Sequence, residues 1–535
     1  MSKLTIRSRG LVLVATGLFC LGVAGFSMAA DRPETLVDLV RTGQREAVLA
    51  AITSPDLDVN AQEADGSTVL LWATYKVDHA LVRALLKAGA KANVTNRYGA
   101  SPLTEAVKLG DAELVRLLLD AGADANSPNQ DNQTALMLAA SVGSLDIAQL
   151  LIQHGADVKA VERFRGQNAL MWAAAGNYPD IVDLLIARGA DVTLRARDDD
   201  WPRQMTSEPR AQFRQTGGLT ALLYATRSGC YRCAVTLVKA GADVNRPNPD
   251  GVTPLINALD NRNFDIAMFL LDQGANPASW DMNGRTPLYV AVDMNSFRPG
   301  GGGGFGGPAV PRQANKATAM EVVNRLLDAG VDANHELTRM RPNGNGRGRF
   351  ADYMMRGGTG PLLIATLGLD DVAIKTLLAR GAEVDLPNVF RITPLMAAVG
   401  MSGSGRAGGG GGAQQGDVQA RVMKVVDLLL GAGANINARV TDSHTHTAKF
   451  VAYVQGRDHE GQTALFAAAE SGWDRVVKQL LDRGADPAVR DAAGKTALDF
   501  ARTPPAAGPG AAAPSAASAA SRAATVALLE AVRAR

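Results

Sequence analysis

The sequence predicts an all-α fold, a solenoid of about 11 or 12 stacked helix pairs, joined by turns that we call fingers and interrupted by several loop insertions. The prediction depends on two markers: a Thr-x-Leu-apolar-x-Ala signature whose copies mostly lie 33 residues apart, and a Gly-Ala or Gly-Val pair that follows 21 residues later in the regular units. Hydrophobic residues make up 46% of the chain but aromatic residues only 5%, so small side chains must do much of the packing. A single helix pair cannot bury its apolar faces alone, whereas stacked pairs bury them against each other.

Each copy of the signature predicts the start of a short helix. Its first residue, usually Thr or Ser, is a typical N-cap, and the proline that follows it in several copies suits the first helical position. In the unit from Gly99 to Asn126, Gly110 ends this first helix, a second helix carries a Leu-Leu pair, and Gly122 supplies a left-handed C-cap. The copies begin at Thr68, Ser101, Thr134, Asn168, Thr220, Thr253, Thr286, Gly360, Thr393, Thr463 and Thr496.

Irregular spacings between the markers locate the insertions, because the extra residues fall either in a finger or between the two helices of a unit. The predicted organisation begins with a signal peptide (1–30), an N-terminal capping unit (31–64), repeats 1 to 4 (65–197) and a finger insertion (198–216). Repeats 5 to 7 follow, up to the first helix of repeat 7 (217–295), then a Gly-rich insertion (296–317), the second helix of repeat 7 (318–337) and a finger insertion (338–357). The last part comprises repeats 8 and 9 (358–441) with a Gly-rich insertion (402–416), a finger insertion (442–459), and repeat 10 with the C-terminal cap (460–535), which includes an Ala/Pro-rich insertion (503–521).

The two kinds of insertion differ in composition. Those between helices are low in complexity, so we expect flexible loops, because such segments cannot offset their ordering entropy by burying apolar surface. A phosphate-binding loop would need a preceding strand and a following helix that opens with Lys-Ser or Lys-Thr, and neither context is present. The finger insertions instead carry arginines and aromatic residues, among them Trp201 and Tyr353, which are residue types common in interaction hot spots. Tolerated surface insertions are the alternative interpretation.

The first 30 residues have the features of a secretory signal peptide: a basic start, an apolar stretch over 11–23 and small residues before position 31. A retained transmembrane anchor is the alternative, but the apolar stretch is short and interrupted. Lipidation at Cys20 is disfavoured because Phe19 stands where a small residue is needed. We therefore expect an exported protein, periplasmic or secreted, that has no membrane insertion after cleavage.

The charge balance argues against a nucleic-acid partner. The formal net charge is +2, and removal of a leader with three basic residues leaves the mature chain near neutrality. Nucleic-acid-binding proteins carry an excess of Lys and Arg instead. The sequence shows no HExxH motif, zinc-type cysteine pairing or Ser-His-Asp set, so we expect neither an enzyme nor a cofactor. We expect a monomer whose partner is another protein.

Two small constellations could carry chemistry. Cys230 and Cys233 have the spacing of a redox dithiol at the start of a second helix, where the helix dipole favours a thiolate. Cys233 also falls where other units place a core residue, so we favour a core cysteine beside a half-exposed one, with a disulfide or redox pair as the alternative. The second set comprises Asp442, His444, His446 and His459. Histidines on one loop more often face solvent than bind metal, so we expect no metal there.

The repeat period and its motifs resemble those of the ankyrin repeat family. Thr-Pro-Leu begins at Thr253, Thr286 and Thr393, and Gly-Ala-Asp-Val-Asn spans 241–245. The resemblance covers almost everything after about residue 34, and the motifs are highly specific when they occur in tandem. It implies antiparallel helix pairs joined by β-turn fingers, with the fingers and first helices lining a concave face. The histidine that the family often places after Thr-Pro-Leu is replaced here, mostly by apolar residues, so we expect apolar packing instead of its hydrogen bond.

The resemblance implies a non-enzymatic scaffold that binds a partner protein through the concave face and the elongated fingers. A redox-active or redox-regulated envelope protein that uses Cys230 and Cys233 is the alternative, and a structural spacer is a third class. The contact positions of the family, together with aromatic residues of the finger insertions, select as candidate partner-binding residues Arg97, Tyr98, Lys108, Phe164, Arg165, Trp201, Arg227, Arg285, Asp293, Tyr353, Phe390, Arg391 and Glu470.

Overall fold

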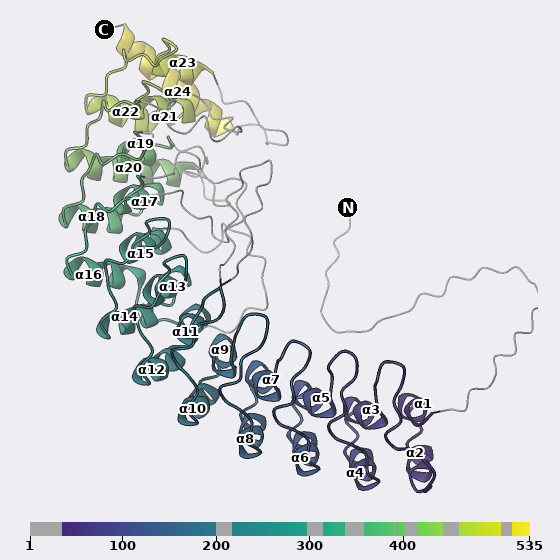
Figure 1. The fold of residues 1–535 in the computed structure, drawn as a ribbon. Helices are drawn as coiled ribbons and strands as arrows, with labels where there is room; N and C mark the ends of the chain where they lie inside the picture. Colours follow the sequence, from purple (N-terminus) through teal and green to yellow (C-terminus); the bar gives the residue numbers. More distant parts are fainter. Residues whose placement is uncertain are drawn as a thin grey trace, which may run out of the picture.

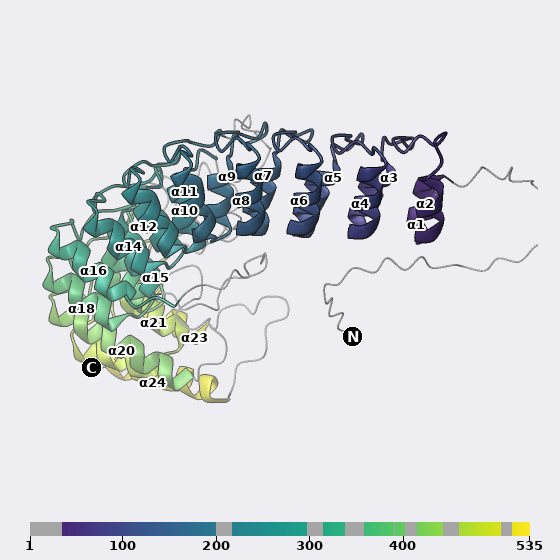
Figure 2. The ribbon, with the colours of Figure 1, turned by 90° about the horizontal axis from the view of Figure 1, so that it is seen from below.

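The computed structural model describes residues 35–198, 217–296, 314–337, 358–389, 391–401, 415–441, 459–503 and 516–534. In these residues the chain forms 24 α-helices, which make 12 pairs, and three isolated β-bridges. Figures 1 and 2 show the pairs stacked side by side into a curved solenoid, with odd-numbered helices on the inner side of the curve and even-numbered helices on the outer side. The structure confirms the predicted all-α solenoid.

Inner and outer helices alternate along the chain. The inner helices are α1 (Leu36–Arg41), α3 (Val69–Tyr75), α5 (Pro102–Leu109), α7 (Ala135–Val142), α9 (Ala169–Ala175), α11 (Ala221–Ser228), α13 (Pro254–Asp260), α15 (Pro287–Ser296), α17 (Pro361–Leu367), α19 (Pro394–Ala398), α21 (Ala464–Ser471) and α23 (Ala497–Arg502). The outer helices are α2 (Arg45–Ala51), α4 (His79–Lys87), α6 (Ala112–Asp120), α8 (Leu145–Gln153), α10 (Pro179–Ala187), α12 (Tyr231–Lys239), α14 (Phe264–Asp272), α16 (Ala319–Asp328), α18 (Asp371–Ala379), α20 (Gln415–Gly431), α22 (Asp474–Asp482) and α24 (Ala516–Arg533).

The inner helices begin where the sequence signature predicts. The hydroxyl of Thr68 accepts a hydrogen bond from the backbone N–H of Leu71 at 3.3 Å, which caps α3. Ser101 caps α5 in the same way, and Pro102 follows at the first helical position. Gly110 ends α5 in the left-handed conformation with φ of +73°, which a residue with a Cβ adopts only with strain.

The core is one continuous apolar layer between the inner and outer rows. It runs through the stack from Val37 to Leu529, and leucines such as Leu118 and Leu151 on the outer helices are fully buried in it. A helix contacts its partner and the neighbouring pairs: α9, for example, packs against α7, α10 and α11. Stability is therefore close to a sum of nearest-neighbour terms.

The insertions between paired helices are partly helical, which corrects the expectation of loops throughout. Helix α20 begins at Gln415, inside the expected Gly-rich insertion 402–416, and α24 begins at Ala516, inside the Ala/Pro-rich insertion 503–521. Alanine is the best helix former, so an alanine-rich segment extends an outer helix that already packs on the stack. The end of the insertion 296–317 is also anchored, because the backbone N–H of Ala317 donates to the Asp265 carboxylate at 2.7 Å.

Asparagines bridge successive repeats in the turns that follow the outer helices. Asn93 donates from Nδ2 to the carbonyl oxygen of Gly122 at 2.8 Å, and its Oδ1 accepts from the N–H of Asp124 at 2.7 Å. The two repeats that follow Asn126 have Lys159 and Thr193 at the equivalent position. Among the described contacts, neither residue forms this bridge. The same two bonds are made by Asn60, Asn126, Asn245, Asn334 and Asn437.

Substitution of a bridging asparagine should weaken one inter-repeat contact. We expect Asn93→Ala to lower the free energy of unfolding by about 1 to 2 kcal/mol, because it removes two hydrogen bonds worth roughly 0.5 to 1.5 kcal/mol each. Lys159→Ala, at an equivalent position without a bridge, should change it by less than about 0.5 kcal/mol. Urea unfolding followed by circular dichroism measures both variants, and equal effects would contradict the bridging role.

The last helix should act as a cap. Leu529 of α24 is only 2% exposed, and α24 packs on α21, α22 and α23. We expect deletion of residues 522–535 to expose the apolar faces of these helices and cause aggregation, and Leu529→Ala to cost about 2 to 5 kcal/mol. Ala527→Ser, on the exposed side of the same helix, is the control. Gel filtration and thermal melting test this, and a monomeric deletion variant with an unchanged melting curve would refute it.

Candidate functional site

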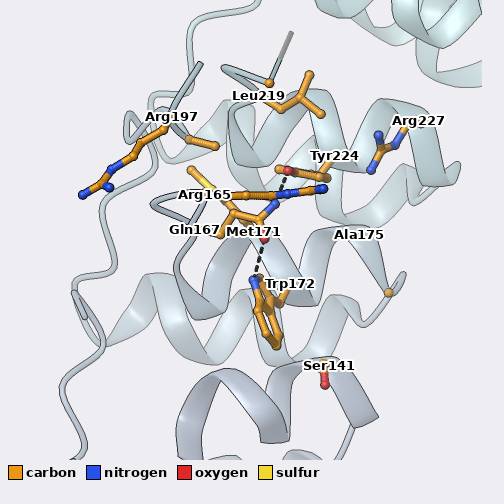
Figure 3. A pocket seen from close by; sticks show the side chains of 13 residues that line it. Ser141, Arg165, Gln167, Met171, Trp172, Ala175, Arg197, Leu219, Tyr224 and Arg227 are labelled. Carbon is orange, nitrogen blue, oxygen red and sulfur yellow. Dashed lines mark hydrogen bonds between the residues drawn. The ribbon is translucent and has the colours of Figure 1, made fainter. Parts of the chain in front are cut away.

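A cleft of about 490 Å³ lies on the inner side of the solenoid between repeats 4 and 5 (Figure 3). Helices α7, α9 and α11 and the fingers that lead into α9 and α11 form its walls. Both fingers and inner helices contribute, as the predicted concave binding face requires. The lining residues are Ser141, Arg165, Gln167, Met171, Trp172, Ala175, Gly176, Ala196, Arg197, Gly217, Leu219, Tyr224 and Arg227.

An amide links the two aromatic residues of the cleft. Gln167 Oε1 accepts a hydrogen bond from Trp172 Nε1 at 3.0 Å, and Gln167 Nε2 donates to the hydroxyl oxygen of Tyr224 (Figure 3). Trp172 belongs to α9 and Tyr224 to α11, so this amide bridges neighbouring repeats. Burial raises the pKa of Tyr224, which keeps its hydroxyl protonated at neutral pH. The aromatic walls are thereby held in fixed orientations.

Two arginines lie beside this network. The Cζ atom of Arg227 is 5.0 Å from the centre of the Tyr224 ring, a cation–π arrangement. Burial lowers the pKa of Arg227 from its usual value, and the positive charge of Arg165 lowers it further. Arginine remains charged at neutral pH even so. Within the part of the chain that the structure describes, neither Arg165 nor Arg227 forms an ion pair with a carboxylate.

The finger before α9 is organised by Glu162, which is buried. Its Oε2 accepts from the N–H of Phe164 at 2.5 Å, and its Oε1 accepts from the N–H groups of Arg165 and Gln167 at 2.6 and 3.0 Å. Shorter fingers use asparagine instead: Asn96 Oδ1 accepts from two backbone N–H groups of its own finger. The finger before α9 contains one extra residue, and the longer side chain reaches the additional N–H group. This carboxylate therefore holds Arg165 in place.

The structure places several predicted partner-binding residues at the surface of the fingers and inner helices. Tyr98 and Phe164 are 76% and 75% exposed at finger tips, an unusual state for large aromatic side chains. Arg97 and Arg391 are also exposed on fingers. On the inner helices, Lys108 is exposed and pairs with Glu105 at 2.8 Å, whereas Glu470 is half-buried. Trp201, Tyr353 and Phe390 lie outside the described residues.

Two predicted contact residues are buried instead of presented to a partner. Arg285 donates from Nε to Asp281 and from Nη1 to Asp260, each at 2.7 Å. Burial works to lower the pKa of Arg285, but the two carboxylates raise it above its usual value. Asp293 is also buried, in the next inner helix. The structure therefore gives Arg285 a structural role in an ion-pair cluster, and leaves no free guanidinium for recognition.

The cysteines form a buried disulfide. Cys230 and Cys233 are bonded to each other, and Cys233 occupies the predicted core position. The expected half-exposure of Cys230 is wrong, because this residue is 2% exposed and takes the N-cap position of α12, where its sulfur accepts from the N–H of Cys233. The disulfide given as the alternative is therefore what the structure has, and the burial of both residues does not favour redox activity.

The predicted residues include two arginines of the cleft, Arg165 and Arg227, but not Arg197 or the aromatic walls. Trp172 and Tyr224 each lie four residues after the start of the signature, at Asn168 and Thr220. This position faces the inner side of the solenoid, so an aromatic residue there marks the concave face. The same position holds Trp72 in the first repeat. The signal was present, but the repeat pattern does not show that two such residues in adjacent repeats border a cleft.

Other sites with recognisable chemistry do not emerge from the described residues. They contain no group of three or more His, Cys, Asp and Glu side chains that could hold a metal ion. His444 and His446, considered as metal ligands above, lie outside them, and His459 bonds to Gln462. No helix among the described residues is long and apolar enough to span a membrane. The signal peptide region 1–30 is not described.

The fold and the cleft define a helical repeat protein whose curved stack carries a cleft on its inner side. The model of ankyrin repeats in three copies matches residues 36–129, 106–196 and 222–298, and the single ankyrin repeat model matches residues 460–492. These matches together cover half of the chain, and the protein belongs to the ankyrin repeat family. A comparison with curated proteins found no match.

The role of Glu162 can be tested by shortening it. We expect Glu162→Asp to lose hydrogen bonds to the finger backbone and to destabilise the protein by about 1 to 3 kcal/mol, because buried N–H groups are left without acceptors. Hydrogen exchange at Phe164, Arg165 and Gln167 should become faster. Glu113→Asp, on the exposed surface of α6, is the control. Unchanged protection of these three amides would show that Glu162 does not organise the finger.

Proposed function

We propose that this protein is an exported, non-enzymatic scaffold that binds a partner protein through its concave face and fingers. The observation that carries the proposal is the exposure of large aromatic residues on the fingers. Phe164 lies on a finger beside the cleft, and Tyr98 and Trp280, the latter 64% exposed, lie on fingers farther along the stack. Exposed aromatic side chains on rigid elements bury large apolar areas on binding, and so dominate many interfaces.

Backbone hydrogen bonds make the fingers a rigid row. The N–H of Arg97 donates to the carbonyl oxygen of Asp65 in the preceding finger at 2.8 Å, and Arg163 donates to Asp131 at 2.8 Å in the same way. Gly99 fits because a Cβ there would lie 2.8 Å from the backbone nitrogen of Gln130. A surface ordered before binding loses little conformational entropy on binding, which supports recognition of a specific partner over a passive spacer.

The proposal that the protein is not an enzyme is supported by the chemistry of the cleft. Its polar side chains are three arginines, the Gln167 amide, the Trp172 indole, the Tyr224 hydroxyl and the Ser141 hydroxyl, which donates to the carbonyl oxygen of Leu138 at 2.9 Å. Such groups are suited to recognition. The tyrosine hydroxyl has a raised pKa and already accepts a hydrogen bond from Gln167. A general base needs a pKa near the working pH, which neither tyrosine nor arginine has here.

Export is supported by the sequence alone, through the basic, apolar and small-residue segments of 1–30. Mass spectrometry of the intact protein from cell fractions would test this part. We expect a chain that begins close to residue 31 in an exported fraction. A full-length chain in the cytoplasm would contradict export without affecting partner binding.

Binding can be tested by crosslinking capture of the partner, followed by titration with the purified partner. We expect Tyr98→Ala and Phe164→Ala each to weaken the affinity by about 1 to 2 kcal/mol, because each removes an exposed aromatic contact. Val372→Ala, at an exposed apolar residue of outer helix α18, should have no effect. Crosslinks confined to outer helices, or equal affinities for all three variants, would overturn the proposed binding face.

A further inference from the structure

We propose that the cleft between α9 and α11 binds an acidic peptide segment in which a carboxylate side chain lies next to an apolar residue. This inference rests on the proposed function and names the chemistry of the partner. The carboxylate would pair with Arg165 and Arg227, and the apolar side chain would pack against Trp172 and Leu219.

Two arginines elsewhere on the inner side are neutralised by carboxylates of the chain itself. Arg41 pairs with Glu63 at 3.0 Å, and Arg285 pairs with Asp260 and Asp281. Within the described residues, Arg165 and Arg227 have no such partner, although burial and mutual repulsion make the charge of Arg227 unfavourable. A bound carboxylate would relieve this repulsion, and arginine binds carboxylates through two parallel hydrogen bonds.

The first repeat contains a closed version of the same arrangement. There Trp72 Nε1 donates to Glu63 at 2.9 Å, and the same carboxylate neutralises Arg41, whose Cζ lies 4.4 Å from the centre of the Trp72 ring. In the cleft, Trp172 donates to the neutral amide of Gln167 instead. The combination of tryptophan, arginine and a hydrogen-bond acceptor recurs, but within the described residues the cleft lacks the negative charge, which a ligand would supply.

Within the described part of the chain, the acids near the cleft form no ion pair with Arg165 or Arg227. Both carboxylate oxygens of Glu162 accept from backbone N–H groups of its finger. Asp198 pairs with Arg195 at 3.7 Å. Asp131 is exposed at the edge of a neighbouring hollow and forms no ion pair with either cleft arginine among the described contacts. The positive charge of the cleft is therefore not compensated from within the described chain.

The walls favour a peptide over a small free anion. Met171, Trp172, Ala175 and Leu219 give the cleft apolar surface beside its arginines, and its volume of about 490 Å³ falls in the range typical of ligand pockets. A phosphate ion would use only the charges and leave the apolar walls in contact with water. An acidic side chain with an apolar neighbour would use both.

Fluorescence anisotropy on the full chain tests the proposal with the fluorescein-labelled peptide Glu-Glu-Phe-Glu-Glu. We expect saturable binding that Arg227→Gln and Arg165→Gln each weaken at least tenfold. Arg188→Gln removes the same charge from the exposed end of α10 in the same repeat, and should leave binding within twofold. The peptides Gln-Gln-Phe-Gln-Gln and Glu-Glu-Ala-Glu-Glu should both bind more weakly, because each lacks one of the two features. Thermal melting confirms that the variants are folded.

Three outcomes would overturn the inference. The first is that the acidic peptide does not bind the native chain, and the second is that Arg188→Gln weakens binding as much as Arg165→Gln and Arg227→Gln do. The third is full displacement of the peptide by inorganic phosphate at a concentration equal to that of the peptide, which would identify a small-anion site. Binding of the captured partner to the variants separates failure of this inference from failure of the proposed function. A partner that still binds Arg227→Gln but is lost with Phe164→Ala would refute only the acidic cleft.

Discussion

The stacking of each helix pair on its neighbours is the interaction on which the whole molecule depends. The helices of one repeat are too short to be stable alone, and their buried faces, such as those of Leu118 and Leu151, are covered only by adjacent repeats. Asparagines such as Asn93 add polar bonds between repeats at the outer turns. Since every contact is local, a change in one repeat affects mainly the two beside it.

This constraint explains where the chain tolerates additional residues. The insertions leave the stack at finger tips or between paired helices, outside the contact between repeats, and the chain returns to standard positions on either side. Loop closure costs little more for a long loop than for a short one. Where an insertion rejoins the stack it is fixed, as Ala317 is by Asp265. Recognition surfaces can therefore vary in the fingers while the stacked helices keep their spacing.

The repeat pattern predicted what depends on local sequence, and failed where distant residues meet. The N-caps at Thr68 and Ser101 and the core position of Cys233 follow from the period of 33 residues. The burial of Arg285 could not be predicted, because it depends on a carboxylate 25 residues away in the preceding repeat. The cleft was also missed, because its amide bridge joins Gln167 to Tyr224 across an insertion. The position of a residue within its repeat predicts the face of the solenoid on which it lies, but not which residues of other repeats it contacts there.

Three departures from the regular pattern coincide around the cleft. Within the described residues, the asparagine bridge is missing at Lys159 and Thr193, as it is at Ala278 farther along the stack. The finger before α9 is one residue longer and uses Glu162, and Arg165 and Arg227 form no ion pair with a described carboxylate. Each departure lowers the stability of the stack or adds nothing to it, whereas the regular repeats keep the repeat pattern. Proteins concentrate such departures where binding requires them. The same repeats also supply the exposed Phe164, so the irregularities of charge, finger length and aromatic exposure coincide at the surface that we propose for binding.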